Sequence, residues 1–317
     1  MKRTKNPAKE AEYRKRAADL VAQMTLHEKV GQMLSWAPAI ERLGIPAYNW
    51  WSEGIHGIGR AGTATVFPQA IGMAAAFDED MMELVGNAVG VEARGKYNMC
   101  RTHGDRDIFK GLTVWAPNIN IFRDPRWGRG HETYGEDPFL TSRLGVRFVE
   151  GMQGDDPDYL QAAACAKHFA VHSGPESDRH HFNAIVSKQD LWETYLPAFR
   201  ALVKEAGVEA VMGAYNRTNG EPCCGSKTLL KDILRDKWQF DGHVTSDCWA
   251  IKDFHTGHMV TDGPVESVAL AVNNGCDLNC GDLYVYLEQA VAEGKVSEEK
   301  IDESLTRLYV TRMRLGM

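Results

Sequence analysis

Short apolar runs that end in polar residues alternate along the chain with longer amphipathic stretches. The runs are typical of buried strands and cover residues 112–116, 162–166, 208–214, 243–245 and 269–272. The ends of the last three lie about 30 residues apart, the length of one strand-plus-helix unit. Strands that alternate with helices in this way predict a parallel sheet.

Three segments between the runs carry helix-start signals. Residues 187–190 and residues 25–28 each match the capping box, in which two side chains satisfy backbone N–H groups of the first turn. An apolar stripe at helical spacing follows each of them, and Pro197 should kink the first of the two helices. Ser297 stands before two glutamates, which suit the positive end of a helix.

A parallel sheet is either open or closed, and the missing phosphate-binding fingerprints favour a closed one. Neither G-x-G-x-x-G nor G-x-x-x-x-G-K-[ST] follows any of the runs. Reactive side chains stand instead at the ends of several strands, where barrel enzymes place their active sites. We predict an α/β fold, a (β/α)8 barrel of the TIM type with one or two irregular strands near the N-terminus. No linker divides the chain, so residues 1–317 should form one domain.

Composition and charge exclude several classes of partner. The chain has 36 Lys and Arg against 43 Asp and Glu, a net charge of −7, so no nucleic-acid-binding surface is expected. No apolar run reaches the roughly 18 residues of a membrane helix. The basic N-terminus has no apolar stretch behind it, so we expect no secretory signal and a cytoplasmic location. Seven cysteines are too few for a disulfide scaffold, and free thiols are expected at Cys223 and Cys224.

Asp247 is the sharpest candidate for chemistry. It follows the run 243–245, and Trp249 stands two residues further on. A carboxylate at a strand end suits a nucleophile beneath a sugar ring, and the neighbouring indole suits stacking of that ring. The alternative is that Ser246 or Asp247 only caps the next helix.

Three other segments carry candidate groups. Lys167 and His168 end a strand, where they suit vicinal hydroxyls or a neighbouring carboxylate, although such pairs are also common in structural hydrogen bonds. In the charged, aromatic and glycine-rich stretch 122–138, we expect one arginine to reach substrate and others to pair with acidic residues of the loop. Residues 49–57 join two tryptophans to Glu53, a combination that carbohydrate sites use, although one tryptophan is expected in the core.

Histidines raise a metal site as an alternative. The candidate ligands are His168, His172, His180 and His181. However, H-E-x-x-H and C-x-x-C are absent, and His168 and His172 fall where a strand becomes a loop, so helical facing cannot be assumed for them. No metal and no cofactor are therefore expected.

The order of these motifs resembles glycoside hydrolase family 3, the family of β-glucosidases, β-xylosidases and related exo-acting enzymes. The resemblance runs from about Ala17 to the C-terminus, and it includes Trp-Ser-Glu-Gly-Ile-His-Gly and Lys-His-Phe-Ala. The segments that carry it are residues 24–34, 51–57, 120–138, 167–170, 212–216 and 245–248.

This resemblance implies a barrel whose nucleophile is the aspartate that matches Asp247. It also implies hydrolysis of a β-linked oligosaccharide or glycoside with retained configuration, through a glycosyl-enzyme. The residues that it places around the first sugar are Glu53, Arg129, Lys167, His168, Met212, Tyr215 and Trp249. Many relatives with glucosidase activity carry an aspartate at the position of Glu53, whereas Trp-Trp-Ser-Glu is similar to the xylosidase-like branch. The expectation is a β-glucosidase, with a β-xylosidase close behind.

The second catalytic group departs from the usual pattern of the family. In most members a glutamate on a following α/β-sandwich domain protonates the leaving oxygen, and this sequence ends at Met317, where such a domain would begin. We therefore expect a barrel that is impaired alone and completed by a family domain supplied elsewhere. One alternative is a self-sufficient enzyme similar to the β-N-acetylhexosaminidases, with Asp178 and His180 as its acid/base dyad. Another is a sugar-binding barrel without turnover.

Overall fold

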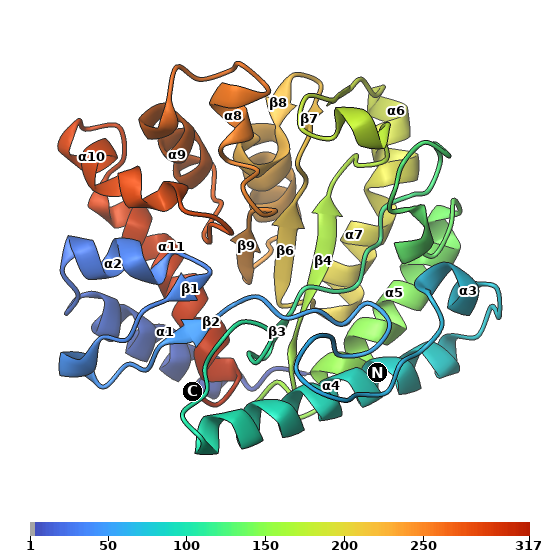
Figure 1. Ribbon diagram of the computed structural model, residues 1–317, viewed down its shortest axis with the longest axis horizontal. Helices are drawn as coiled ribbons and strands as arrows, with labels where there is room; N and C mark the ends of the chain where they lie inside the picture. Colours follow the sequence, from blue (N-terminus) through green and yellow to red (C-terminus); the bar gives the residue numbers. More distant parts are fainter. Residues whose placement is uncertain (1–3) are drawn as a thin grey trace.

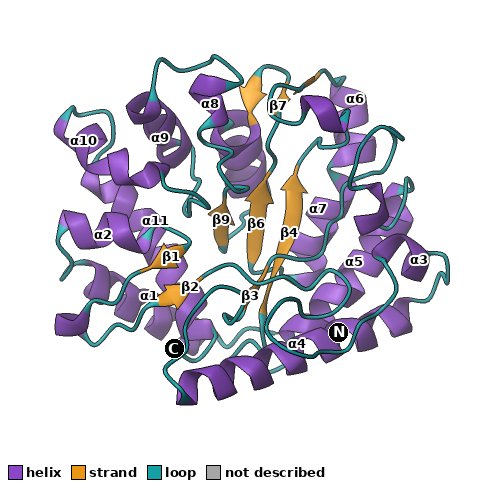
Figure 2. Ribbon diagram, viewed as in Figure 1, coloured by secondary structure: helices purple, strands orange, loops and turns teal. Residues whose placement is uncertain are grey.

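Parallel strands form the centre of the molecule, and helices surround them (Figure 1). The computed structural model describes residues 4–317. Four strands form a parallel sheet in the order β3-β4-β6-β9. Their bounds are β3 (Thr113–Val114), β4 (Ala163–Phe169), β6 (Ala210–Gly213) and β9 (His243–Thr245). Their C-terminal ends therefore meet on one side of the molecule, the upper side in Figure 2.

Short bridged segments close this sheet into a ring. Residues 50–52 pair with β3, and residues 278–279 pair with β9. Residues 34–35 hydrogen-bond to both of these segments, so the two edges of the sheet are joined. The closed parallel arrangement confirms the predicted α/β barrel. Two of its irregular segments lie near the N-terminus, as predicted, and residues 278–279 form a further one.

Helices and small sheets cover the ring. The α-helices are α1 (Pro7–Val21), α2 (Leu26–Gln32), α3 (Ala70–Ala74), α4 (Glu79–Thr102), α5 (Pro138–Gln153), α6 (Lys188–Asp190), α7 (Pro197–Ala201), α8 (Asp253–Thr256), α9 (Pro264–Asn273), α10 (Leu287–Ala292) and α11 (Glu298–Arg314). Short 3-10 turns are η1 (Glu41–Leu43), η2 (Gly130–Glu132), η3 (Glu176–Asp178), η6 (Cys223–Gly225) and η8 (Leu283–Tyr286), and π-helical segments are η4 (Leu191–Tyr195), η5 (Leu202–Ala206) and η7 (Lys227–Lys237).

The two small sheets join β1 (Trp36–Ala37) to β2 (Tyr48–Asn49), and β5 (Asn183–Ala184) to β7 (Arg217–Thr218) and β8 (Glu221–Pro222). The β7 and β8 strands lie above the C-terminal ends of the barrel strands (Figure 1). Within residues 4–317, no helix has both the length and the apolar composition that a bilayer crossing requires.

The helix-start predictions are confirmed. Thr25 caps α2 through a complete capping box, and the Ser187 side chain accepts from the backbone N–H of Asp190 in α6. Ser297 is the N-cap residue of α11. The chain after α6 is not one continuous α-helix, because Pro197 cannot donate a backbone hydrogen bond to the turn before it. Instead, the π-helical segments η4 and η5 flank α7.

The strand predicted at 269–272 is wrong, because these residues belong to α9. Pro264 occupies the start of this helix, where its fixed φ is favourable. Val265, Val268 and Val272 follow at helical spacing and are buried against the barrel. A short apolar run does not by itself distinguish a buried strand from a buried helix.

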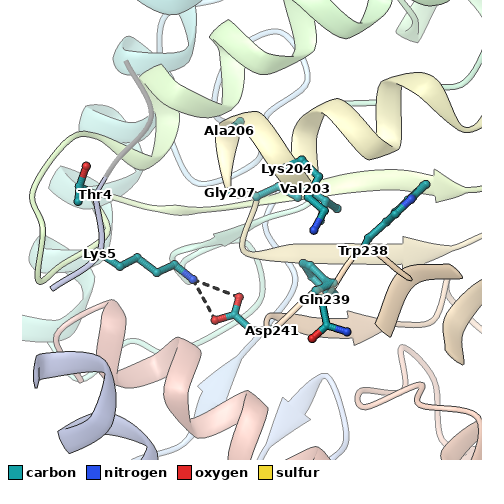
Figure 3. Close-up of a pocket in the computed structure, with 11 residues that line it drawn as sticks. Thr4, Lys5, Val203, Lys204, Ala206, Gly207, Trp238, Gln239 and Asp241 are labelled. Atoms are coloured by element: carbon teal, nitrogen blue, oxygen red, sulfur yellow. Dashed lines mark hydrogen bonds and ion pairs between the residues drawn. The ribbon is translucent and has the colours of Figure 1, made fainter. Parts of the chain in front are cut away.

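A cavity of about 450 Å³ lies at the N-terminal ends of the strands (Figure 3). It opens between Lys5 and residues 238–241, and Lys5 Nζ donates to both oxygens of Asp241, at 3.1 and 3.2 Å. None of the residues that the sequence singled out for chemistry lines it. Its charged groups are already paired, so this end of the barrel shows no catalytic arrangement.

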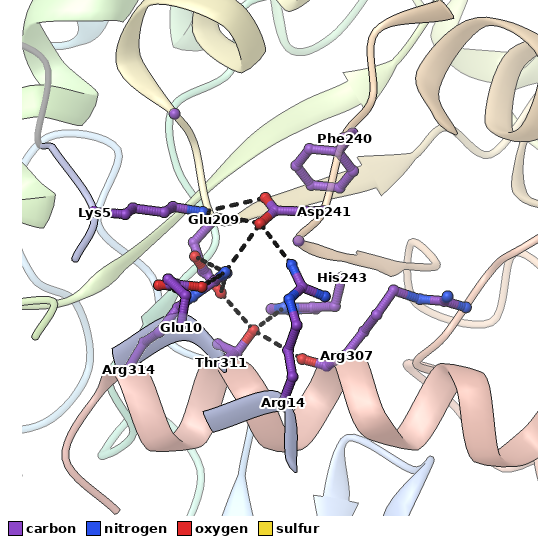
Figure 4. A network of polar contacts seen from close by, with 12 residues as sticks. Lys5, Glu10, Arg14, Glu209, Phe240, Asp241, His243, Arg307, Thr311 and Arg314 are labelled. Carbon is purple, nitrogen blue, oxygen red and sulfur yellow. Dashed lines mark hydrogen bonds and ion pairs between the residues drawn. The ribbon is translucent and has the colours of Figure 1, made fainter. Parts of the chain in front are cut away.

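A buried ionic network adjoins this cavity (Figure 4). Arg314 of α11 is fully buried and donates to both oxygens of Glu209 at 2.9 Å. It also donates to Glu10 of α1 at 2.5 Å and to Asp241 at 3.0 Å. Burial opposes the charged form of Glu209, but the Arg314 charge outweighs it and lowers the pKa of Glu209. The network ties the first and last helices to the base of the barrel.

Replacing Arg314 with methionine should destabilise the protein strongly. The Glu209 carboxylate would stay buried without its main partner, and breaking a buried ion pair in this way costs about 3–5 kcal/mol. Urea unfolding followed by circular dichroism measures the change in the free energy of unfolding. The matched control Arg16→Met removes an exposed pair with Glu12 and should cost at most about 1 kcal/mol. Equal losses for the two variants would contradict the role given to the network.

Candidate active site

The predicted residues converge at the C-terminal ends of the strands, because parallel strands bring these ends together. Lys167 and His168 belong to β4, and Met212 belongs to β6. Tyr215 follows shortly after β6, and Asp247 follows shortly after β9. Side chains from neighbouring strands thus share one end of the barrel, opposite to the ionic network.

The carboxylate of Asp247 is buried, with 7% of the residue exposed. Its Oδ1 accepts a 2.8 Å hydrogen bond from the backbone N–H of Cys248, and its Oδ2 has no hydrogen-bond partner among residues 4–317. Burial raises the pKa of Asp247 above its ordinary value, while the charges of Arg129 and Lys167 counteract part of this rise. The side chain therefore presents one free carboxylate oxygen beside positive charge.

His168 is neutral, and its contacts show which nitrogen carries the proton. Arg129 Nη1 lies 2.9 Å from Nε2, which must accept because a guanidinium only donates. Nδ1 therefore carries the proton and donates to Asn120 Oδ1 at 2.9 Å. Burial, followed by the Arg129 charge, lowers the pKa of His168. The 3.6 Å approach of Nε2 to Asp247 Oδ2 is consequently not an ion pair.

Arg129 also pairs with an acidic residue of its own loop, as predicted for the arginines of 122–138. Its Nε and Nη2 donate to the two oxygens of Glu132 at 2.8 and 2.7 Å. The amide of Asn118 donates to the same carboxylate at 3.3 Å. Three donors fix Glu132, so Arg129 is held rigidly where its charge acts on the carboxylate of Asp247.

Glu53 follows the barrel segment 50–52, which is separated from β4 by β3. Its Oε2 lies 3.8 Å from Lys167 Nζ, and its Oε1 accepts a 2.7 Å hydrogen bond from the indole N–H of Trp51. The Trp51 ring stacks on Trp115, with 5.4 Å between ring centroids. Trp50 is 1% exposed, which confirms that one of the two adjacent tryptophans belongs to the core. The arrangement combines charged hydrogen-bonding groups with an aromatic wall.

Tyr215 is enclosed by charged and aromatic side chains. The guanidinium of Arg179 lies 5.5 Å from its ring centroid, and the imidazole of His180 meets it edge to face at 5.0 Å. The Tyr215 hydroxyl faces the carboxylate of Asp247 and lowers the pKa of that group. Burial, followed by the Asp247 charge, raises the pKa of Tyr215, which keeps the hydroxyl protonated. Tyr215 therefore keeps a protonated hydroxyl that acts on the candidate nucleophile.

His180 does not pair with Asp178, so the structure does not form the predicted dyad. Its Nδ1 lies instead 2.7 Å from Asp253 Oδ2, at the start of α8. Asp178 and His180 stand two positions apart at the end of η3, and residues at this spacing on a helical turn do not face each other. Sequence reasoning missed Asp253 because it lies 73 positions away from His180.

Trp249 and Met212 lie at different depths of the site. Trp249 is 50% exposed at the rim, where its ring is free to stack on a ligand. Met212 is almost fully buried in β6, so it can offer only an apolar wall. One exposed ring and one buried apolar side chain thus stand at the two positions.

A disulfide that the sequence analysis did not predict joins Cys248, next to the candidate nucleophile, to Cys280. The backbone N–H of Trp249 donates to the carbonyl of Cys280 at 2.6 Å, so the same two segments are also hydrogen-bonded. Cys223 and Cys224 are free, as predicted.

The histidines of the site take part in hydrogen bonds. No group of three His, Cys, Asp or Glu side chains in the described part of the chain is placed to hold a metal ion. His172 Nδ1 lies 2.9 Å from Asn216 Oδ1, and its ring meets His168 edge to face at 5.0 Å. Burial, followed by the Arg129 charge, lowers the pKa of His172 to about 3, so it is neutral.

Comparison with known proteins identifies the family. The family pattern described as "Glycosyl hydrolase family 3 N terminal domain" matches residues 18–311. The chain belongs to glycoside hydrolase family 3. The "Xylan 1,4-beta-xylosidase" of Xylanibacter ruminicola is 48% identical over 309 residues, which cover 96% of this chain and 36% of that protein. The "Probable beta-D-xylosidase 7" of Arabidopsis thaliana is 43% identical, over 96% of this chain and 41% of that protein.

Solved structures share the barrel. A GH3 exo-beta-xylosidase, XlnD, in complex with a xylobiose aziridine activity-based probe, has a TM-score of 0.89 and 34% identity. That match covers 96% of this chain and 40% of the other. A beta-glucosidase from Listeria innocua in complex with isofagomine has a TM-score of 0.82 and 29% identity, over 95% of this chain and 46% of the other. This family 3 chain thus spans less than half the length of these relatives, and the (β/α)8 barrel is the part they share.

Removing the disulfide should lower the stability of the barrel. The double variant Cys248→Ser, Cys280→Ser opens a loop closed across 32 positions, and loop-closure entropy assigns such a bond about 3–4 kcal/mol. Scanning calorimetry without reductant measures the loss. The control Cys100→Ser changes a free, half-buried cysteine and should stay within about 0.5 kcal/mol of the parent. A double variant as stable as the parent would show that the bond adds nothing.

Proposed function

We propose that this chain is the sugar-binding, nucleophile-bearing barrel of a retaining exo-β-glycosidase, with Asp247 as the nucleophile. One observation carries the proposal: a buried carboxylate at a strand end with Oδ2 free of partners and the charges of Arg129 and Lys167 close by. Burial strips the carboxylate of water, and the two cations keep it ionised, which are the properties that a nucleophile needs. Membership of family 3 supports the assignment.

The reaction takes two steps. Asp247 Oδ2 attacks the anomeric carbon while the bond from that carbon to the leaving oxygen breaks, through an oxocarbenium-like transition state. A general acid gives its proton to the leaving oxygen, and the sugar becomes an ester of Asp247. The same group, now a base, then takes a proton from water, whose oxygen attacks the anomeric carbon and displaces the carboxylate. Two inversions retain the configuration.

Glu53 and Lys167 are suited to bind sugar hydroxyls. Glu53 Oε2 and Lys167 Nζ are 3.8 Å apart, too far for a direct hydrogen bond and close enough for one hydroxyl to donate to the first and accept from the second. Arg129 is already committed to Glu132 and His168, so it contributes to the sugar site mainly through its charge. The exposed indole of Trp249 and the apolar wall of Met212 complete the subsite.

Xylose is the proposed sugar of this subsite. Curated relatives that carry β-xylosidase names are 41–48% identical to this chain, and among the solved structures the exo-β-xylosidase is 34% identical whereas the β-glucosidases are 27–30% identical. Glu53 follows Trp50, Trp51 and Ser52, the setting that resembles the xylosidase-like branch. The sequence analysis favoured glucose over xylose as the sugar, and these observations support the opposite preference.

The general acid is proposed to be a glutamate outside these 317 residues, since the relatives are more than twice as long as the matched part. Within the barrel, Glu53 is engaged by Trp51 and Glu132 by Arg129. The alternative of a self-sufficient hexosaminidase-like enzyme loses its main support, because Asp178 does not pair with His180. General acid catalysis contributes about 10²–10⁴-fold. The chain alone should therefore be slow on poor leaving groups.

Covalent labelling of Asp247 tests the proposal. With 2,4-dinitrophenyl 2-deoxy-2-fluoro-β-xyloside, the leaving group needs no acid and the fluorine slows hydrolysis of the ester, so the glycosyl-enzyme should accumulate. Intact mass spectrometry should show one fluoroxylosyl group per chain, and peptide mapping should place it on Asp247. Asp247→Asn should abolish labelling, whereas Asp232→Asn, an exposed carboxylate of η7, should not. Bound xylose without any adduct would favour a sugar-binding barrel, and faster labelling by the glucose-configured probe would refute xylose.

The labelling rate should fall at acid pH with a midpoint above the ordinary aspartate pKa of about 3.9. Only the ionised carboxylate attacks, and burial raises the pKa of Asp247, so protonation as the pH falls removes the nucleophile. Lys167→Met removes a charge that lowers this pKa and should move the midpoint to higher pH. Labelling rates over the acid range measure both effects. A midpoint that moves to lower pH in Lys167→Met would contradict this electrostatic account.

A further inference from the structure

Asp253 and His180 form a contact that the proposed reaction does not use. Asp253 begins α8, a few residues after the loop that carries Asp247, and His180 belongs to the loop after η3. His180 Nδ1 lies 2.7 Å from Asp253 Oδ2. Asp253 is buried, whereas about half of the His180 side chain is exposed. The contact therefore ties an exposed loop to a buried carboxylate at the mouth of the barrel.

The backbones of the same two segments also meet. A Cβ at Gly257 would lie 2.4 Å from the carbonyl oxygen of His180, so only glycine permits this approach. The backbone N–H groups of Gly257 and His258 both donate to the Asp253 carbonyl, at 2.9 and 2.6 Å. Asp253 is thus fixed by its own helical turn, and the loop of His180 packs directly on that turn.

The imidazole of His180, held by Asp253, in turn packs against the ring of Tyr215. The two rings meet edge to face with 5.0 Å between their centroids, and Arg179 lies over the Tyr215 ring at 5.5 Å. The Tyr215 hydroxyl faces the carboxylate of Asp247. Contacts therefore lead from Asp253 through His180 to Tyr215, whose hydroxyl acts on the carboxylate of the proposed nucleophile.

We propose that Asp253 and His180 are positioning residues that hold the Tyr215 hydroxyl against the carboxylate of Asp247. Asp253 fixes the orientation of the imidazole through Nδ1, the imidazole restrains the tyrosine ring, and the tyrosine hydroxyl favours the ionised nucleophile. The inference rests on the proposed function of Asp247. The other charged or titratable groups that face this series of contacts are Arg129, Lys167, His168, His172, Arg179, His181, Arg217 and His258.

The test uses the dinitrophenyl fluoroxyloside with His180→Ala, Asp253→Ala and the double variant. Each single variant should label about 10-fold more slowly or worse, because a small misplacement near the reacting atoms costs up to about 100-fold. The double variant should be no slower than the slower single variant, since the two residues act as a unit. The acid midpoint should also move to higher pH in His180→Ala, in the direction produced by Tyr215→Phe, whereas Asp253→Ala also removes a negative charge that interacts with Asp247 and opposes this shift.

A matched control separates this role from a general effect of losing a histidine. His27 Nδ1 lies 2.7 Å from Glu288 Oε1, the same type of contact at the same distance, on the outer helices α2 and α10. His27→Ala should leave both the labelling rate and the acid midpoint unchanged. If Asp253→Ala does not fold, Asp253→Asn keeps the size of the side chain and should show the same changes in smaller amount.

The outcomes distinguish this inference from the proposed function. If the parent chain is not labelled at all, the proposed function fails. If the parent is labelled and the His180 and Asp253 variants match it in rate and acid midpoint, the positioning role fails. Slower cleavage of poor leaving groups only, with normal labelling by the dinitrophenyl probe, would also overturn it, because that pattern marks a proton donor.

Discussion

The negative charge of Asp247, buried at the end of β9, is the constraint on which the candidate site depends. A buried carboxylate is costly unless positive charge and hydrogen-bond donors surround it. Here Arg129 comes from the loop before α5, Lys167 from β4, and a backbone N–H from Cys248. Arg129 and Lys167 belong to separate elements, so closure of the barrel brings both charges to the buried carboxylate, where they offset part of the effect of burial.

The charges that surround Asp247 are themselves balanced. Glu132 takes two hydrogen bonds from Arg129, and Glu53 lies near Lys167. His168 stays neutral because burial and the Arg129 charge disfavour its protonation, so it adds no further cation. The site therefore combines alternating charges with a neutral imidazole, and a polyhydroxylated ligand finds both donors and acceptors in it.

Four of the five strand-like runs were predictable because each ends in polar residues at the mouth of the barrel. The run at 269–272 was wrongly predicted as a strand because its apolar residues fit the helical spacing of α9 equally well. The closing segments 34–35, 50–52 and 278–279 are too short to carry a periodic signal. They are defined by hydrogen bonds between distant parts of the chain, which no local pattern contains.

The candidate site residues were predicted from motifs, and their partners were not predicted. Glu53 and Lys167 do lie near each other, although β3 separates the barrel segments that carry them. The partner of His180 is Asp253, 73 positions away, and no spacing rule within the loop could reveal it. The disulfide beside Asp247 was not predicted for the same reason, since its two cysteines meet only when the barrel is closed.

The N-terminal ends of the strands carry the stabilising network, and the C-terminal ends carry the candidate site. At the N-terminal ends of the strands, Arg314 and Glu209 hold the terminal helices to the barrel through a buried network. At the C-terminal ends, Asp247 keeps one carboxylate oxygen without a hydrogen-bond partner among the described residues. This division is the usual one in parallel barrels.

A crystal structure of the chain trapped with the 2-fluoroxylosyl probe tests the central claim most directly. The account predicts continuous electron density from Asp247 Oδ2 to the anomeric carbon, with the sugar hydroxyls between Glu53 and Lys167. A sugar bound with its anomeric carbon turned away from Asp247, or joined to a different side chain, would contradict it.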